Sequence, residues 1–174
     1  MKKLAVLAVA LFITAPAFAC CGDGIVKLSL WDNIAVALPN NIHNVTGVSL
    51  GIGSNVDTLD GLQWDFIYNN ARKVRGVKAA GFYNTADIVY GMQGSLVTVN
   101  NRDLKGLQSG LVNISQGEVT GVQWGLVNLA HGHVTGVQLG LVNYVNSIKG
   151  LQLGLLNIAR NGYLPAMIFI NGRF

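Results

Sequence analysis

A short phrase recurs four times in succession, and its regular spacing constrains the fold more than any other feature of the chain. The phrase reads Gly-Leu/Val-Gln-x-Gly-Leu-Val/Leu-Asn, and its copies are 106–113, 121–128, 136–143 and 150–157. The leading glycine recurs further back at Gly91, Gly76, Gly61 and Gly47, so that successive starts are 14 or 15 residues apart. A fixed period of this kind is typical of a domain built from one repeated unit. We therefore predict a single domain, with repeats from about residue 45 to residue 158.

The repeat favours β-strands over helices. Glycines four residues apart would cost a helix about 1 kcal/mol each. Alternation fits better, since Val122, Trp124 and Leu126 would lie on one face of a strand, and Gly121, Gln123, Gly125 and Val127 on the other. Segments such as 115–118, 130–133 and 159–162 have the composition of turns. Each repeat thus predicts one strand of about eleven residues followed by a turn of about four.

Composition and the N-terminal segment indicate an exported globular protein. Hydrophobic residues make up 51% of the chain and charged residues 11%, which excludes intrinsic disorder. Residues 1–19 contain Lys2 and Lys3, an apolar run over 4–13 and a small-x-small site at 17–19, as a secretory signal peptide does. The expected mature chain is 20–174. It has ten cations against eight anions, a balance that favours no nucleic-acid partner.

The two cysteines lie at the expected cleavage site and allow two interpretations. Cys20 is a candidate for lipid attachment after lipoprotein processing, although Ala17 and Phe18 match the usual preceding box poorly. The alternative is that Cys20 and Cys21 form a disulfide between chains or no bond, because neighbouring cysteines cannot bridge without strain.

Two further strands are expected outside the repeats. Residues 25–38 are β-branched and partly alternating, and Pro39 begins a turn. At the other end, Asn161-Gly162 is a strong turn signal, and an apolar closing strand covers 163–174 and ends on Phe174. With one strand per repeat the total is ten. An even number of strands of this length could cross a bilayer obliquely.

The repeated phrase, the opening Leu28–Trp31 and the Asn-Gly-x-Leu-Pro ending followed by an apolar tail resemble a family of exported bacterial surface-repeat proteins. The resemblance covers nearly all of the mature chain, is specific for the last four repeats and is weaker between Asn55 and Asn100. It implies an envelope or surface location in bacteria with an outer membrane, and it brings no catalytic residues. Phe174 also resembles the closing residue of outer-membrane barrels, which the assembly machinery reads as a signal.

Two all-β architectures fit these observations. The first is a small closed antiparallel barrel of about ten short strands, which satisfies every strand edge. The alternative is a β-solenoid with one coil per repeat, in which identical side chains stack into ladders. The ladder residues would be Gln63, Gln93, Gln108, Gln123, Gln138, Gln152, Asn113, Asn128, Asn143 and Asn157. The sequence places the barrel slightly ahead, because of the even strand count and Phe174.

No set of residues has the spacing of a catalytic or metal site, so we expect no enzyme activity, metal or cofactor. His131 and His133 flank a glycine in a turn without a nearby ligand cluster. Asp57, Asp60 and Asp65 follow one another along a turn and a strand, where carboxylates are usually solvated. Residues that align with Trp64 and Trp124 vary from glycine to leucine, which predicts that this position faces lipid, solvent or a partner rather than a packed interior.

The expected function is that of a structural or interaction protein of the bacterial cell envelope, as an outer-membrane barrel without catalytic activity. The alternative is a secreted or lipid-anchored solenoid that acts as an adhesin or as a fibre subunit. Expected partners are components of the outer membrane or cell surface, with self-association as a further possibility.

Overall fold

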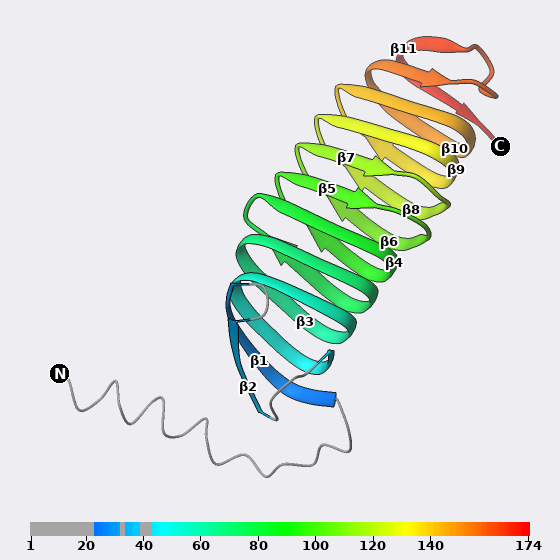
Figure 1. Ribbon diagram of the computed structural model, residues 1–174. Helices are drawn as coiled ribbons and strands as arrows, with labels where there is room; N and C mark the ends of the chain where they lie inside the picture. The colour runs from blue at the N-terminus through cyan, green and yellow to red at the C-terminus, as the bar shows by residue number, and fades with distance from the viewer. Residues whose placement is uncertain (1–22, 32–33, 39–42) are drawn as a thin grey trace.

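The computed structural model describes residues 23–31, 34–38 and 43–174, which wind into a stack of elongated coils, a β-solenoid (Figure 1). All secondary-structure elements in these ranges are strands, so the predicted all-β class is confirmed. The strands are β1 (Asp23–Trp31), β2 (Ile34–Leu38), β3 (Asn44–Ala80), β4 (Tyr83–Gly94), β5 (Val97–Asn100), β6 (Leu104–Ser109), β7 (Val112–Ser115), β8 (Val119–Trp124), β9 (Val127–Leu139), β10 (Val142–Ala159) and β11 (Ala166–Arg173).

The expectation of a closed antiparallel barrel is wrong, because successive repeats pair in parallel. β8 lies beside β9 with Gly121 opposite Gly136 and Gln123 opposite Gln138. The pairs β6–β8 and β4–β6 have the same register. An antiparallel barrel reverses direction at every strand and would repeat by hairpin, whereas parallel stacking brings the same residue of each repeat into one column. The architecture is therefore the solenoid that the sequence left as the alternative.

The leading glycine of each repeat sets the close approach of neighbouring coils. All eight leading glycines have positive φ angles, between 131° and 145°. A Cβ atom on Gly121 would lie 2.0 Å from the carbonyl oxygen of Gly106 in the preceding coil. Only glycine combines this backbone conformation with this contact, which explains why the position does not vary along the chain.

Each of the later repeats has a corner at its second glycine, where the sequence predicted a continuous strand. β6 ends at Ser109 and β7 begins at Val112, and the same gap separates β8 from β9. The alternation of inward and outward side chains shifts by one residue there, so that Gln123 and Asn128 are both buried. The predicted alternation, continued past Leu126, would put Asn128 on the outward face with Val122, and it is wrong there for this reason.

The interior of the solenoid has an apolar half and a polar half. Beside the turns between repeats, aliphatic side chains stack in two columns, which lie two residues before and about nine residues after each leading glycine. This apolar core consists of Val45, Val56, Leu59, Ala71, Val74, Ala86, Val89, Leu104, Val119, Ala130, Val134, Val145, Ile148 and Ala159. Beside the Gly-Leu corner, the interior is filled by the side chains of Gln and Asn.

Antiparallel strands cover both ends of the parallel stack. β1 pairs in parallel with β3, and β2 turns back along β1. The single opening strand predicted over 25–38 is therefore two strands. At the other end β11 runs antiparallel to β10, after a turn at Asn161 as predicted. Such capping strands cover the open edge that the last coil would present to another chain. In the described ranges, the chain forms no helix of the length and apolarity that a membrane span requires.

Candidate interaction surface

Outward-facing side chains make the outside of the solenoid apolar around the Gly-Leu corner. In the coil that starts at Gly121, the outward residues are Val122, Trp124, Leu126, Val127 and Leu129 in succession. Trp124 is 63% exposed and Leu126 48% exposed. The next outward position is His131, where the polar edge begins. We name the outward residues between the leading glycine and the polar edge of each coil the apolar wrap.

Most of the same outward positions are apolar in the other coils; Ser109, opposite Trp124, and Thr85, in the column of Leu129, are exceptions. In the last coil, Leu153, Leu155 and Leu156 are all exposed. The exposed large hydrophobic residues of the wrap are Leu50, Ile52, Leu62, Trp64, Phe66, Val77, Phe82, Met92, Leu96, Leu111, Trp124, Leu126, Leu141, Leu153, Leu155 and Leu156. Single exposed hydrophobic residues are ordinary, but a continuous set on this scale marks a binding surface.

Buried asparagines hold the corner from which the wrap projects. Asn113 Nδ2 donates to the carbonyl oxygen of Trp124, the residue before the second glycine of the next coil, at 2.9 Å. Asn128 makes the equivalent bond to Leu139 at 2.8 Å. Trp124 O also accepts from the backbone N–H of Gly110 at 3.0 Å, so the asparagine adds a second donor to this carbonyl. The asparagine side chain therefore ties neighbouring coils together on the inside of the corner, and the leucine that follows the glycine faces outward.

The predicted ladder residues are all buried, each with at most 2% of its surface exposed. Nε2 of Gln123 donates to Oε1 of Gln108 at 2.9 Å, and the same bond joins Gln138 to Gln123 and Gln152 to Gln138, at 2.7 Å each. Nδ2 of Asn113 donates to Oδ1 of Asn128 at 2.8 Å, and the row continues through Asn143 to Asn157 at 2.7 and 2.8 Å. The glutamine donors point towards the N-terminus of the chain, and the asparagine donors towards its C-terminus.

The glutamine row does not extend to the first two predicted members. Lys78 occupies the glutamine column next to Gln93, and neither polar side-chain atom of Gln93 has a hydrogen-bond partner among the described residues. Gln63 instead donates to Ser54 and Asp65, at 2.5 and 2.9 Å. The structure therefore brings four of the six glutamines together, and the other two lie in a charged part of the core.

Asp65 and Lys78, in the early coils, are buried, so the expectation that Asp65 is solvated is wrong. Desolvation raises the pKa of Asp65 above its ordinary value, while hydrogen bonds from Ser54 and Gln63 act in the opposite direction. Desolvation lowers the pKa of Lys78 well below its ordinary value, and the charges of Asp65 and Asp87 oppose that shift. Lys78 Nζ donates to the carbonyl oxygen of Thr85.

The edge opposite the corner is polar and carries the remaining candidate residues. Asp57 accepts from Arg72 at 3.2 Å and lies 3.8 Å from His43. These partners are exposed, so the ion pairs contribute little stability. His133 Nδ1 lies 2.9 Å from Ser147 Oγ. Within the described ranges, no three His, Cys, Asp or Glu side chains are grouped so that they could hold a metal ion.

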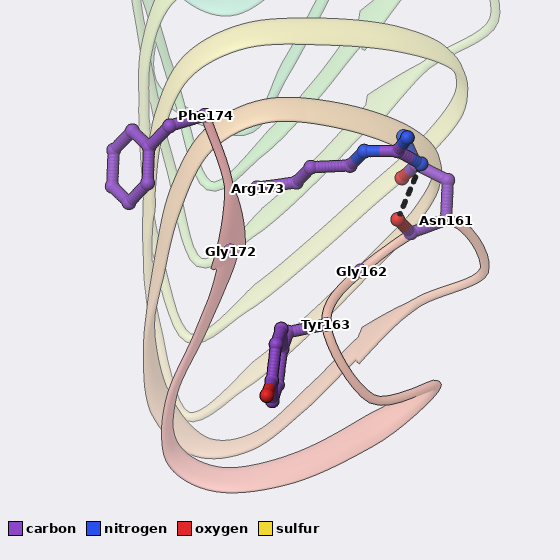
Figure 2. Close-up of a pocket in the computed structure, with 6 residues that line it drawn as sticks. All are labelled: Asn161, Gly162, Tyr163, Gly172, Arg173 and Phe174. Carbon is purple, nitrogen blue, oxygen red and sulfur yellow. Dashed lines mark hydrogen bonds between the residues drawn. The ribbon is translucent and has the colours of Figure 1, made fainter.

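A shallow hollow lies at the C-terminal end, between the last turn and β11 (Figure 2). It is lined by Asn161, Gly162, Tyr163, Gly172, Arg173 and Phe174, and Arg173 Nη1 donates to the carbonyl oxygen of Asn161 at 3.1 Å. Tyr163 and Phe174 point into solvent and are 88% and 95% exposed. The hollow is therefore open to solvent on the side of these two rings. Cys20, the candidate for lipidation, lies outside the described residues.

Sequence reasoning expected that Trp64 and Trp124 would face outward, and the structure exposes both. What it missed is the continuity of the wrap around the corner, because it treated the second glycine as part of a straight strand. A comparison with models of protein families, with curated proteins and with solved structures found no match to this chain.

Proposed function

We propose that the protein is a non-catalytic structural or interaction protein of the bacterial cell envelope, which acts through the outer surface of its solenoid. The observation that supports this most directly is the apolar wrap. A continuous exposed hydrophobic surface is costly in water and is typical of proteins that are covered by a partner. The interior supports the structural part of the proposal, because the buried Gln and Asn side chains of the later coils form hydrogen bonds from coil to coil.

The capping strands count against the alternative that the protein is a subunit of an end-to-end fibre. Growth of such a fibre needs a free parallel edge on the terminal coil, whereas β2 and β11 lie antiparallel over the two ends. The capping strands do not count against side-by-side association through the apolar wrap, because they leave the wrap uncovered.

Fractionation of cells that produce the full chain tests the proposal. We expect the protein in the envelope fraction. Its intact mass should correspond to residues 20–174 and would show whether Cys20 carries an acyl group. A full-length product with residues 1–19 still attached, recovered from the cytosol, would rule the proposal out.

A further inference from the structure

We infer that the apolar wrap binds a lipid surface, so that the solenoid lies along the headgroup layer of a membrane with its Gly-Leu corners immersed. The inference rests on the proposed envelope function and names the partner of the same surface. Three features of the described chain carry it, namely the extent of the wrap, its curvature and the charges at its border.

The wrap extends from the first layer of the stack to the last. In β1, Val26 and Leu28 pair with Val48 and Leu50, and they extend the two outward columns of the first strand of each repeat. In β11, Ile170 pairs with Leu153 and extends the second of these columns. Leu28 and Ile170 are about half exposed. Ten layers at a strand spacing of about 4.8 Å make an apolar ridge about 43 Å long.

The curvature of the wrap favours a fluid partner over a second copy of the chain. Apolar residues lie on the first strand of each coil, at the corner and on the second strand, as Val122, Leu126 and Leu129 show. A flat face of another solenoid would cover one of these sides and leave the other in water. Lipid can close around all of them, as it does around the apolar face of an interfacial helix, which enters the headgroup and acyl boundary by roughly 5–10 Å.

Charged and aromatic residues lie where the wrap meets the polar edge. Lys105 and Lys149 occupy the exposed position just before the leading glycine, and Lys105 Nζ lies 5.7 Å from the centre of the Tyr90 ring. Arg75 has the same position, where it lies 3.8 Å from Asp60. Lysines at such a border reach acidic headgroups while their stems stay on apolar surface. The expected partner is therefore a membrane that contains anionic lipid.

Flotation with lipid vesicles tests the inference. The chain is recovered from the cell envelope with Cys20→Ser in every variant, so that no acyl group contributes. We expect it to float with vesicles of phosphatidylcholine and phosphatidylglycerol and to bind pure phosphatidylcholine roughly 10- to 30-fold more weakly. Trp64 and Trp124 supply a second measurement, because their fluorescence should shift to the blue on binding and should be quenched by brominated lipid.

A matched pair of variants shows whether the wrap is responsible. Replacing Leu111, Leu126 and Leu141 by serine removes three corner leucines that are 48–49% exposed, and it should weaken binding by roughly 10- to 100-fold. Gln116→Ser with His131→Ser alters the polar edge and should change binding by less than about twofold. Circular dichroism should show the same strand content in all three proteins.

The inference fails if envelope-derived protein does not float, or if the three serines leave flotation unchanged. It also fails if sedimentation in lipid-free buffer reveals a stable dimer that the serine substitutions dissociate, because the occupant would then be a second copy. These outcomes are separate from a failure of the proposed function, which would be seen as an unprocessed cytosolic product before any vesicle is added.

Discussion

Replacement of Asn128 by alanine should destabilise the protein strongly, although the residue is polar and its neighbours are unchanged. The Asn128 side chain is fully buried and makes three hydrogen bonds. Its Nδ2 donates to Leu139 O and to Asn143 Oδ1, at 2.8 and 2.7 Å, and its Oδ1 accepts from Asn113. The substitution leaves Asn143 Oδ1 without its donor, whereas Leu139 O still accepts from the backbone N–H of Gly125 at 2.9 Å. Asn113 Nδ2 keeps its other partner, Trp124 O.

The expected magnitude follows from that one acceptor. An unsatisfied buried acceptor costs about 1–3 kcal/mol, so the substitution should lower the free energy of unfolding by about 1–3 kcal/mol. For a chain of this length that corresponds to a fall in Tm of roughly 2–12 °C. Calorimetry or thermal circular dichroism would measure it.

Asn101→Ala is the matched control for this substitution. Asn101 is exposed and donates one hydrogen bond, to Asp87 at 2.9 Å, so its removal should change stability by less than about 0.5 kcal/mol. If the two variants melted at the same temperature, the buried asparagine row would not stabilise the stack, and our account of the corner would be wrong.

Three further predictions concern the glycine column, the buried lysine and the C-terminal cap. Gly121→Ala should prevent folding or cause aggregation, because its Cβ would lie 2.0 Å from a backbone oxygen; Gly94→Ala, whose Cβ would meet Ser109 Oγ at 3.1 Å, should remain folded. Because the pKa of Lys78 is lowered in the folded chain, the unfolded chain binds more protons, and the contribution of Lys78 to stability should rise as pH increases towards about 10.4. The denaturant midpoint of the wild-type protein should therefore rise more steeply with pH than that of Lys78→Gln. Deletion of 163–174 should uncover the edge of β10 and produce assemblies visible by light scattering, whereas a monodisperse product would show that β11 does not act as a cap.

The repeat, the strand content and the glycine columns could be predicted from the sequence, because each corresponds to residues that recur at a regular spacing. It did not reveal the corner at the second glycine. Alternation through that glycine would put Gln123 and Asn128 on opposite faces, and only a one-residue shift brings both inside. The sequence does contain a signal that Gln123 faces inward. Gln123 and its equivalents in the last four repeats do not vary, whereas the residue at the Trp124 position varies in size between repeats.

The preference for a barrel came from the even count of predicted strands and from the closing Phe174. Neither feature determines whether successive strands pair in parallel or antiparallel, which is what separates the two architectures. Parallel stacking gives each buried amide the next copy of itself as a partner, as the Gln123–Gln138 bond does. Asp65 could not be predicted to be buried, because its environment depends on Ser54, which lies one coil away.

The in-register column of leading glycines also has a consequence for how such a chain can change its length. Steps of 14 and of 15 residues both fit the column, as between Gly136 and Gly150 and between Gly121 and Gly136, because the turns absorb the difference. Gain or loss of one whole repeat would change the distance between the two ends of the stack by about 4.8 Å, and the contacts between adjacent coils would remain of the same kind. A gene duplication inside the array could therefore lengthen the protein without any new fold having to be found.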